Sequence, residues 1–135
     1  MSDIVRAAGD TYPSKTVIKI GGVPVDLRGW HVDLRFKKDN EEWVINCMIT
    51  DQRAGKVSIY PHARRRVDIT DPEVILNPSE YKMTGEDGAN QVWDEVDAGA
   101  HYPFYIVRWK TFDDGYTEEM THTTGHVILT GRYPV

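Results

Sequence analysis

One eight-residue stretch constrains the fold more than any other part of the sequence, because apolar and polar residues alternate strictly along it. It runs from Trp30 to Lys37, with apolar residues at positions 30, 32, 34 and 36 and polar residues, among them Arg35, between them. Successive side chains of a β-strand point to opposite faces, whereas a helix would scatter these residues around its axis. The stretch therefore predicts a central strand with one face in the core and the other, including Arg35, in water.

Weaker alternation recurs about every 12 residues, with turns between the segments. The predicted strands cover residues 15–20, 23–27, 43–49, 56–60, 102–112, 116–122 and 126–133. We predict no helix longer than one turn. Short strands at regular spacing are typical of an antiparallel β-sandwich or barrel rather than of alternating strands and helices.

Two segments depart from this pattern. Residues 1–14 predict an extended arm, since Pro13 pushes Tyr12 toward extended geometry. Residues 61–101 are rich in Pro, Gly and acidic residues and predict an irregular insertion. Within it we expect short strands near 65–69 and 91–96 and one helical turn at 71–73, where Asp and then Pro suit a helix start. The chain is therefore expected to form one β-sandwich domain over 15–135, interrupted at about 61–101.

The composition excludes several classes of protein. A chain of 135 residues with 40% hydrophobic and 27% charged residues has the size and balance of one globular domain. The net charge of -5 weighs against a general nucleic-acid binder, which needs a basic surface. The single cysteine, Cys47, excludes an intrachain disulfide and is expected to be a small buried hydrophobe. We see neither a signal peptide nor an apolar run near the roughly 20 residues that span a bilayer.

The order of several weak motifs resembles a known family. Residues 9–13 (Gly-Asp-Thr-Tyr-Pro) precede an alternating strand, and residues 23–29 precede the strand at 30–37. After the next hairpin come residues 50–57, and then the strand at 105–112 with its Asp-Asp-Gly turn and a closing strand. This order is similar to that of the N-terminal domain of phage baseplate upper proteins. The resemblance covers residues 9–60 and 102–133, whereas 61–101 is longer than the corresponding connection in the family.

The resemblance implies an immunoglobulin-like antiparallel β-sandwich that anchors a receptor-binding protein or fibre to the virion. The sequence shows no recognisable set of catalytic residues, which agrees with a structural role. In a continuous strand, His122 and His126 would lie roughly 13 Å apart, too far to share one metal ion. The acidic residues Asp94, Glu95 and Asp97 are expected to form a solvated loop, with a weak Ca²⁺ site as the alternative. We therefore expect no enzymatic activity, no cofactor and no metal.

Two features of the insertion suggest contacts with other molecules. Arg64, Arg65 and Arg66 form a basic run that would pair with acidic groups of a neighbouring subunit, touch nucleic acid or stay solvated. Trp93 lies in a polar context and is the best candidate for an exposed tryptophan. It would contact a partner, stack on a sugar, or pin the insertion to its own sandwich.

The sequence thus predicts a non-enzymatic virion structural protein of a tailed phage: a tail, baseplate or neck adaptor made in the host cytoplasm. Its expected partners are other virion proteins, with copies of the chain in a symmetric ring and without membrane or nucleic acid. The expected subunit-interface residues are Ile4, Val5, Tyr12, Arg35, Arg64, Arg65, Arg66 and Trp93. The main alternative is a carbohydrate-binding module with a groove lined by Trp93, His101 and Tyr102, and a small hydrolase or metal enzyme is the third reading.

Overall fold

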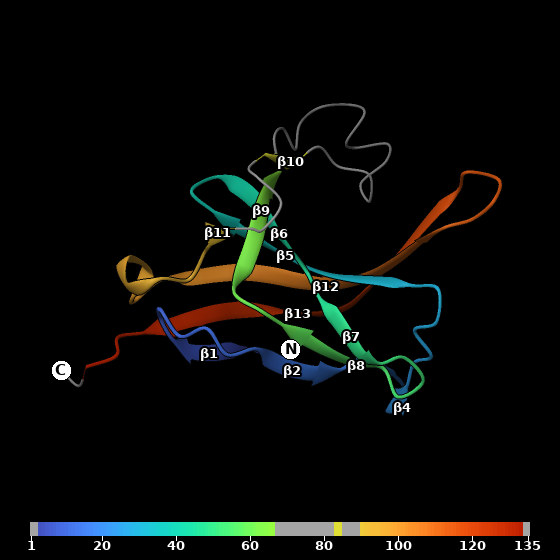
Figure 1. Ribbon diagram of the computed structural model, residues 1–135, viewed down its shortest axis with the longest axis horizontal. Coiled ribbons are helices and arrows are strands. Elements are labelled where there is room, and N and C mark those ends of the chain that lie inside the picture. The colour runs from blue at the N-terminus through green and yellow to red at the C-terminus, as the bar shows by residue number, and fades with distance from the viewer. Residues whose placement is uncertain (1–2, 67–82, 85–89, 134–135) are drawn as a thin grey trace.

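The backbone forms two β-sheets and a short separate hairpin (Figure 1). The computed structural model describes residues 3–66, 83–84 and 90–133. Over these residues the regular structure is β-strand, apart from one 3-10 turn, η2 (Glu95–Asp97). No helix in these ranges is long and apolar enough to cross a membrane. The predicted all-β class is confirmed, and the arrangement is consistent with a β-sandwich.

The larger sheet has eight strands in the spatial order β1-β13-β12-β5-β6-β9-β10, and β11 also pairs with β9. Neighbours are antiparallel, except that β1 runs parallel to β13. The strands are β1 (Ile4–Ala7), β5 (His31–Lys38), β6 (Glu41–Asn46), β9 (His62–Arg66), β10 (Met83–Thr84), β11 (Asn90–Gln91), β12 (His101–Thr111) and β13 (Thr117–Thr130).

The smaller sheet contains three antiparallel strands in the order β2-β8-β7, namely β2 (Ser14–Val17), β8 (Lys56–Ile59) and β7 (Met48–Asp51). A two-stranded hairpin, β3 (Lys19–Ile20) and β4 (Val23–Pro24), stands apart from both sheets. The chain crosses between sheets at Cys47, whose N–H still bonds the Val32 carbonyl at 2.9 Å. The single strand predicted over 43–49 is therefore wrong, because the segment is split between β6 and β7.

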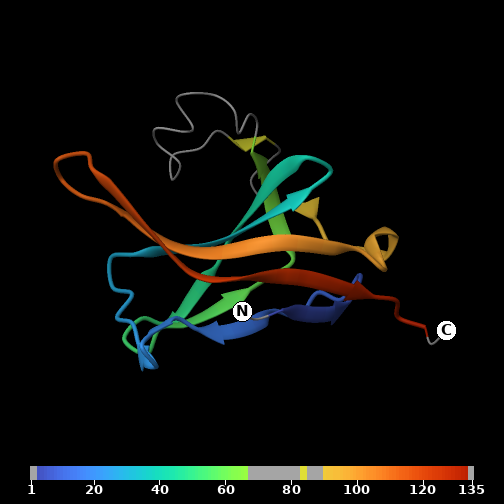
Figure 2. The same cartoon turned by 180° about the vertical axis from the view of Figure 1, so that it is seen from behind.

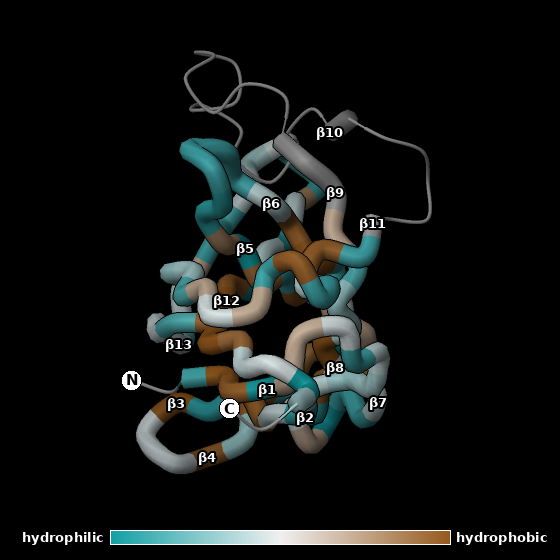
Figure 3. The backbone as a smooth tube through the Cα atoms, turned by 90° about the vertical axis from the view of Figure 1, so that its left-hand side faces the viewer, coloured by the Kyte–Doolittle hydropathy of each residue, from teal (hydrophilic) through white to brown (hydrophobic). Residues whose placement is uncertain are grey.

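The core contains the apolar residues of both sheets. Val32, Leu34 and Phe36 of β5 are buried as predicted. They join one cluster with side chains that include Ile45, Val57, Ile59, Phe104, Ile106, Val127 and Leu129. Hydrophobic segments along β6, β12 and β8 gather toward the middle of the molecule in Figure 3. Each fully buried side chain of this kind stabilises the fold by about 1.5–3 kcal/mol.

The opposite face of β5 differs from the prediction. His31 and Lys37 are exposed, as expected, but Asp33 and Arg35 are each only 1% exposed. The expectation that Arg35 faces water is wrong, because side chains from β12 and β13 enclose its guanidinium. Alternation along one strand predicts which residues share a face, but it does not show what covers that face.

The N-terminal segment is not a free arm in this structure. Residues 4–7 form β1, which pairs with β13 from Ile4–Val127 to Ala7–Thr130. Arg6 is buried and holds the following loop, since its Nη2 donates to the carbonyls of Asp10 at 2.8 Å and Tyr12 at 2.7 Å. One edge of β1 is thus paired within the chain, while Val5 and Tyr12 stay exposed.

The described parts of the insertion extend the larger sheet. β9 pairs with β6, so the short strand predicted at 65–69 begins earlier, at His62. The strand predicted at 91–96 is confirmed only at Gln91, because Asp94 caps η2 and ends the extended backbone. The helical turn predicted at 71–73 lies outside the described residues, as do the side chains of Arg64, Arg65 and Arg66.

A two-stranded ribbon projects from the larger sheet. β12 pairs with β5 only as far as Trp109–His31, but with β13 as far as Thr111–Thr117. No strand in the described part of the chain pairs with the hairpin end of β12 and β13, which extends beyond the sheet in Figures 1 and 2. The predicted break at Gly125 is wrong, since β13 runs through this glycine opposite Phe104.

Candidate functional site: a buried charge network on the larger sheet

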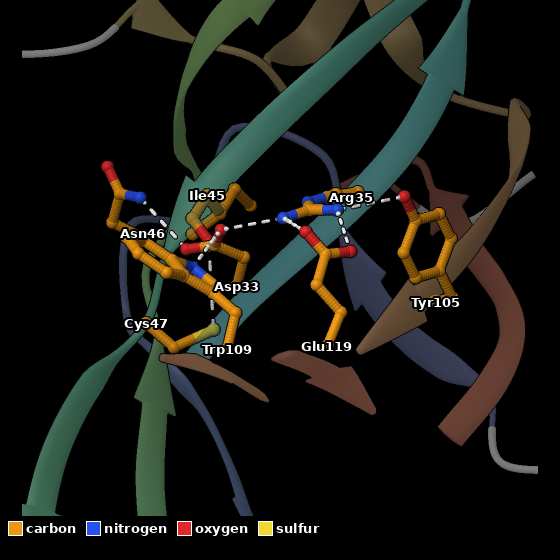
Figure 4. Close-up of polar contacts among 8 residues, drawn as sticks. All are labelled: Asp33, Arg35, Ile45, Asn46, Cys47, Tyr105, Trp109 and Glu119. Atoms are coloured by element: carbon orange, nitrogen blue, oxygen red, sulfur yellow. Dashed lines mark hydrogen bonds and ion pairs between the residues drawn. The ribbon is translucent and has the colours of Figure 1, made fainter. Parts of the chain in front are cut away.

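The outer face of the larger sheet holds a polar network centred on Asp33 and Arg35 of β5 (Figure 4). Strand register brings its members together from distant parts of the chain. Arg35 lies opposite Tyr105 of β12, and Trp109 of β12 lies opposite Glu119 of β13. With Asn46 of β6, the network therefore ties four neighbouring strands across their shared face.

Asp33 accepts hydrogen bonds on both carboxylate oxygens. Asn46 Nδ2 donates to Oδ1 at 2.9 Å, and Trp109 Nε1 donates to Oδ2 at 2.8 Å. Arg35 Nη2 donates to the same Oδ2 at 3.4 Å. A buried carboxylate needs such donors to offset its lost hydration. Asp33 thus links side chains from three strands, and both of its carboxylate oxygens already accept hydrogen bonds.

Arg35 bridges Asp33 to Glu119. Its Nη1 donates to Glu119 Oε1 at 3.1 Å and its Nη2 to Oε2 at 3.4 Å, so the pair is bidentate. Nη1 also donates to the Tyr105 hydroxyl at 3.3 Å. Burial by itself lowers the pKa of Arg35, but the interactions with Tyr105 and Glu119 outweigh it and raise that pKa. The guanidinium is a permanent cation within the network.

Cys47 lies beside the network and is chemically quiet. Its thiol contacts the Ile45 carbonyl at 3.8 Å. Burial, followed by the nearby negative charge of Asp33, raises the pKa of this thiol. Because the thiolate is the nucleophile, a neutral thiol in this position does not support cysteine catalysis. The interpretation of Cys47 as a small hydrophobe agrees with its packing against the core cluster.

Two surface hollows flank the network. One, of about 320 Å³, lies near Arg35, Glu42 and Tyr105. The other, of about 220 Å³, is lined by residues that include Asp33, Cys47, Trp30, His31 and Trp109. The His31 and Trp109 rings stack with centroids 4.2 Å apart. The second hollow is thus aromatic and shallow, with the Asp33 carboxylate already occupied by hydrogen-bond donors.

A second polar cluster holds the insertion against the sheet. Lys38 Nζ pairs with Asp97 Oδ1 at 2.7 Å, and the Tyr102 hydroxyl donates to the same oxygen at 2.9 Å. Asp97 is buried, and its other oxygen accepts from the Asp94 N–H at 3.0 Å. The expectation of a fully solvated acidic loop is therefore wrong at Asp97. Among the described residues, no group of three or more His, Cys, Asp or Glu side chains is placed to hold a metal ion.

Trp93 is the clearest correction among the expected interface residues. It is 0% exposed and packs against Phe36 with ring centroids 5.6 Å apart. The Arg6 guanidinium lies 5.6 Å from its ring centre. A polar sequence context suggested exposure, but the side chain turns into the core. The alternative that Trp93 pins the insertion to its own sandwich is confirmed.

The remaining expected residues are spread over the molecule. Ile4 is half-buried, whereas Val5 and Tyr12 are exposed near the β1 edge of the larger sheet. Tyr12 lies near Trp93, because the Arg6 guanidinium is 4.5 Å from the Tyr12 ring centre and 5.6 Å from that of Trp93. Sequence reasoning assigned no contact to Glu119 or Asn46, because alternation within one strand does not show which side chains meet across strands. The one available signal was the alternation that puts Tyr105 and Trp109 on one face of β12.

Together the fold and the site define an all-β protein whose buried charges serve internal contacts. Comparison of the sequence with protein-family models and with curated proteins gave no match. The function is therefore argued from the surface that the fold exposes.

Proposed function

We propose that this chain is a non-enzymatic structural subunit that works by assembly, as a tail, baseplate or neck adaptor of a tailed-phage virion. The order of motifs in the sequence, similar to baseplate upper proteins, supports the phage setting and an immunoglobulin-like variant of the sandwich. The observation that carries the assembly role is the projecting end of the β12–β13 ribbon.

The end of this ribbon presents aromatic side chains to solvent. Phe112 is 38% exposed and Tyr116 is 63% exposed, and their rings face each other with centroids 6.5 Å apart. Met120, further along β13, is also exposed. A two-stranded ribbon without a third strand is marginal in water, and aromatic residues and Met are enriched at protein interfaces. A partner that covers the ribbon would stabilise it.

The β1 edge offers a second contact surface. β1 pairs with β13 on one side and is the last strand of the larger sheet. Val5 and Tyr12 are exposed nearby. Edge strands carry unpaired backbone groups that readily accept a further strand. The buried network of Asp33, Arg35 and Glu119 keeps the sheet rigid behind both surfaces.

The test is incorporation into particles. We expect mass spectrometry of purified virions to detect the chain in fixed proportion to a major tail protein. In a phage that carries Phe112→Ser and Tyr116→Ser, the chain should be lost from the particles while it stays folded in the lysate. Val96→Ser is a matched control, since Val96 is exposed but lies on η2 rather than on the ribbon. Virions that lack the wild-type chain would contradict the proposal.

The aromatic hollow favours a second candidate, a carbohydrate-binding module. The groove expected around Trp93 is wrong, because that side chain is buried. Trp30, His31 and Trp109 instead surround the hollow of about 220 Å³, and aromatic rings present flat apolar faces. A titration of tryptophan fluorescence with host-surface oligosaccharides tests this function. Saturable quenching that is lost in Trp30→Ala would support it, and an unchanged signal would remove it.

A further inference from the structure

A hollow on the smaller sheet is lined by residues of β2, β7 and β8. Its volume is about 400 Å³, and its lining includes Lys15, Val17, Thr50, Lys56 and Ser58. Ser58 forms part of this lining and is only 4% exposed, whereas both lysines are exposed. We call this feature the lysine hollow.

The lysine hollow carries two lysines, and the nearest carboxylate by strand register is that of Asp51, which lies opposite Lys56 on β7. Lys15 lies opposite Ser58 and Val17 lies opposite Lys56, so the two lysines are diagonal neighbours on one face. The backbone positions of diagonal pairs in an antiparallel sheet are about 7–8 Å apart, so both lysine side chains can reach one anionic group. Within the part of the chain that the structure describes, neither lysine forms an ion pair. An anionic group seated between them would pair with both.

The ribbon tip carries the complementary charge. Asp113 and Asp114 lie in the turn that the Phe112 N–H closes on the Tyr116 carbonyl at 2.8 Å, and both are exposed. Asp114 Oδ1 accepts from the Tyr116 N–H at 2.9 Å, whereas Asp113 has no hydrogen bond or ion pair with any residue that the structure describes. The tip lies well away from β2 and β8 in both Figure 1 and Figure 2. One copy therefore does not fill its own lysine hollow.

We propose that the acidic, aromatic ribbon tip of one copy docks in the lysine hollow of a second copy. This inference rests on the proposed assembly function and names the contact through which copies associate. The carboxylate of Asp113 would lie between Lys15 and Lys56, and Phe112 and Tyr116 would cover the apolar wall near Val17. The two surfaces differ, so the contact is head-to-tail and each bound copy keeps one unused surface for the next.

Charge reversal tests each surface alone. We expect sedimentation velocity to show that Lys15→Glu with Lys56→Glu weakens self-association by more than roughly tenfold, because like charges then meet. Asp113→Lys with Asp114→Asn should do the same, and the asparagine keeps the acceptor for the Tyr116 N–H. Lys19→Glu is the matched control, since this exposed lysine does not line the hollow. Circular dichroism confirms that each variant is folded.

Mixing the two variants gives the sharper test. The hollow variant (Lys15→Glu with Lys56→Glu) keeps the wild-type ribbon tip. The tip variant (Asp113→Lys with Asp114→Asn) keeps the wild-type lysine hollow. In the mixture both kinds of tip meet a hollow of opposite charge, so equal amounts should again form assemblies, although each variant alone associates weakly. Wild-type association that neither variant changes would overturn this contact and leave the assembly function standing. A wild type that is monomeric at every concentration would contradict the assembly function itself.

Discussion

Arg35 shows how a single residue reverses an expectation drawn from pattern. Its place between apolar residues predicts a surface position, but Glu119 and Tyr105 enclose it at 3.1 and 3.3 Å. These partners lie 84 and 70 positions away in the sequence, and alternation within one strand contains no information about them. The inward residues Val32, Leu34 and Phe36 were predictable, because their position depends on local periodicity alone.

The network makes Arg35 a sensitive position. Arg35→Ala should leave Asp33 and Glu119 without their shared cation, and breaking a buried ion pair in this way typically costs about 3–5 kcal/mol. Urea denaturation followed by tryptophan fluorescence measures the loss. Lys37→Ala on the same strand is the control and should change stability by less than about 0.5 kcal/mol, because that side chain is exposed. Equal effects of the two changes would refute the buried position of Arg35.

Cys47 should make stability fall at alkaline pH. Burial raises the pKa of the folded thiol above the value of about 8.5 for an exposed cysteine. The folded state then favours the neutral thiol. The contribution of Cys47 to the free energy of unfolding is therefore complete below about pH 8.5 and declines as the pH rises further. Urea midpoints measured from pH 7 to pH 10 should fall less steeply in Cys47→Ala than in the wild type. Parallel slopes would contradict the raised pKa.

At the scale of elements, pairing between distant strands decides what local pattern leaves open. The strands at 30–37, 56–60 and 102–112 were predictable from alternation and turn residues. The parallel pairing of β1 with β13 was not, because it joins residues 4–7 to residues 127–130. Gly125 appeared to break β13, yet the strand continues through it and pairs it with Phe104.

Trp93 is the main anchor between the insertion and the core. Trp93→Ala should destabilise the protein by about 3–5 kcal/mol, the usual cost of removing a large buried aromatic side chain. Thermal unfolding followed by circular dichroism measures this change. Val96→Ala, three positions further on and exposed, should leave the unfolding temperature nearly unchanged. If both variants unfold at the wild-type temperature, Trp93 does not anchor the insertion.

At the scale of the whole molecule, the buried charges hold one copy together, and the exposed aromatic residues are available to a partner. Asp33, Arg35 and Glu119 tie strands together inside one copy. Phe112 and Tyr116 stand on a ribbon that leaves the sheet, with two carboxylates between them and the lysine hollow elsewhere on the surface. The sequence identifies these charged residues, but only the fold shows which of them are buried within one copy and which are exposed to a partner.

Self-association of the purified chain tests the central claim most directly. Sedimentation velocity across a hundredfold range of protein concentration should show a sedimentation coefficient that rises with concentration at low salt. The rise should diminish at 1 M salt, where the Debye length shrinks to about 3 Å and exposed charges are screened. A single monomeric species at every concentration and salt level would contradict the account.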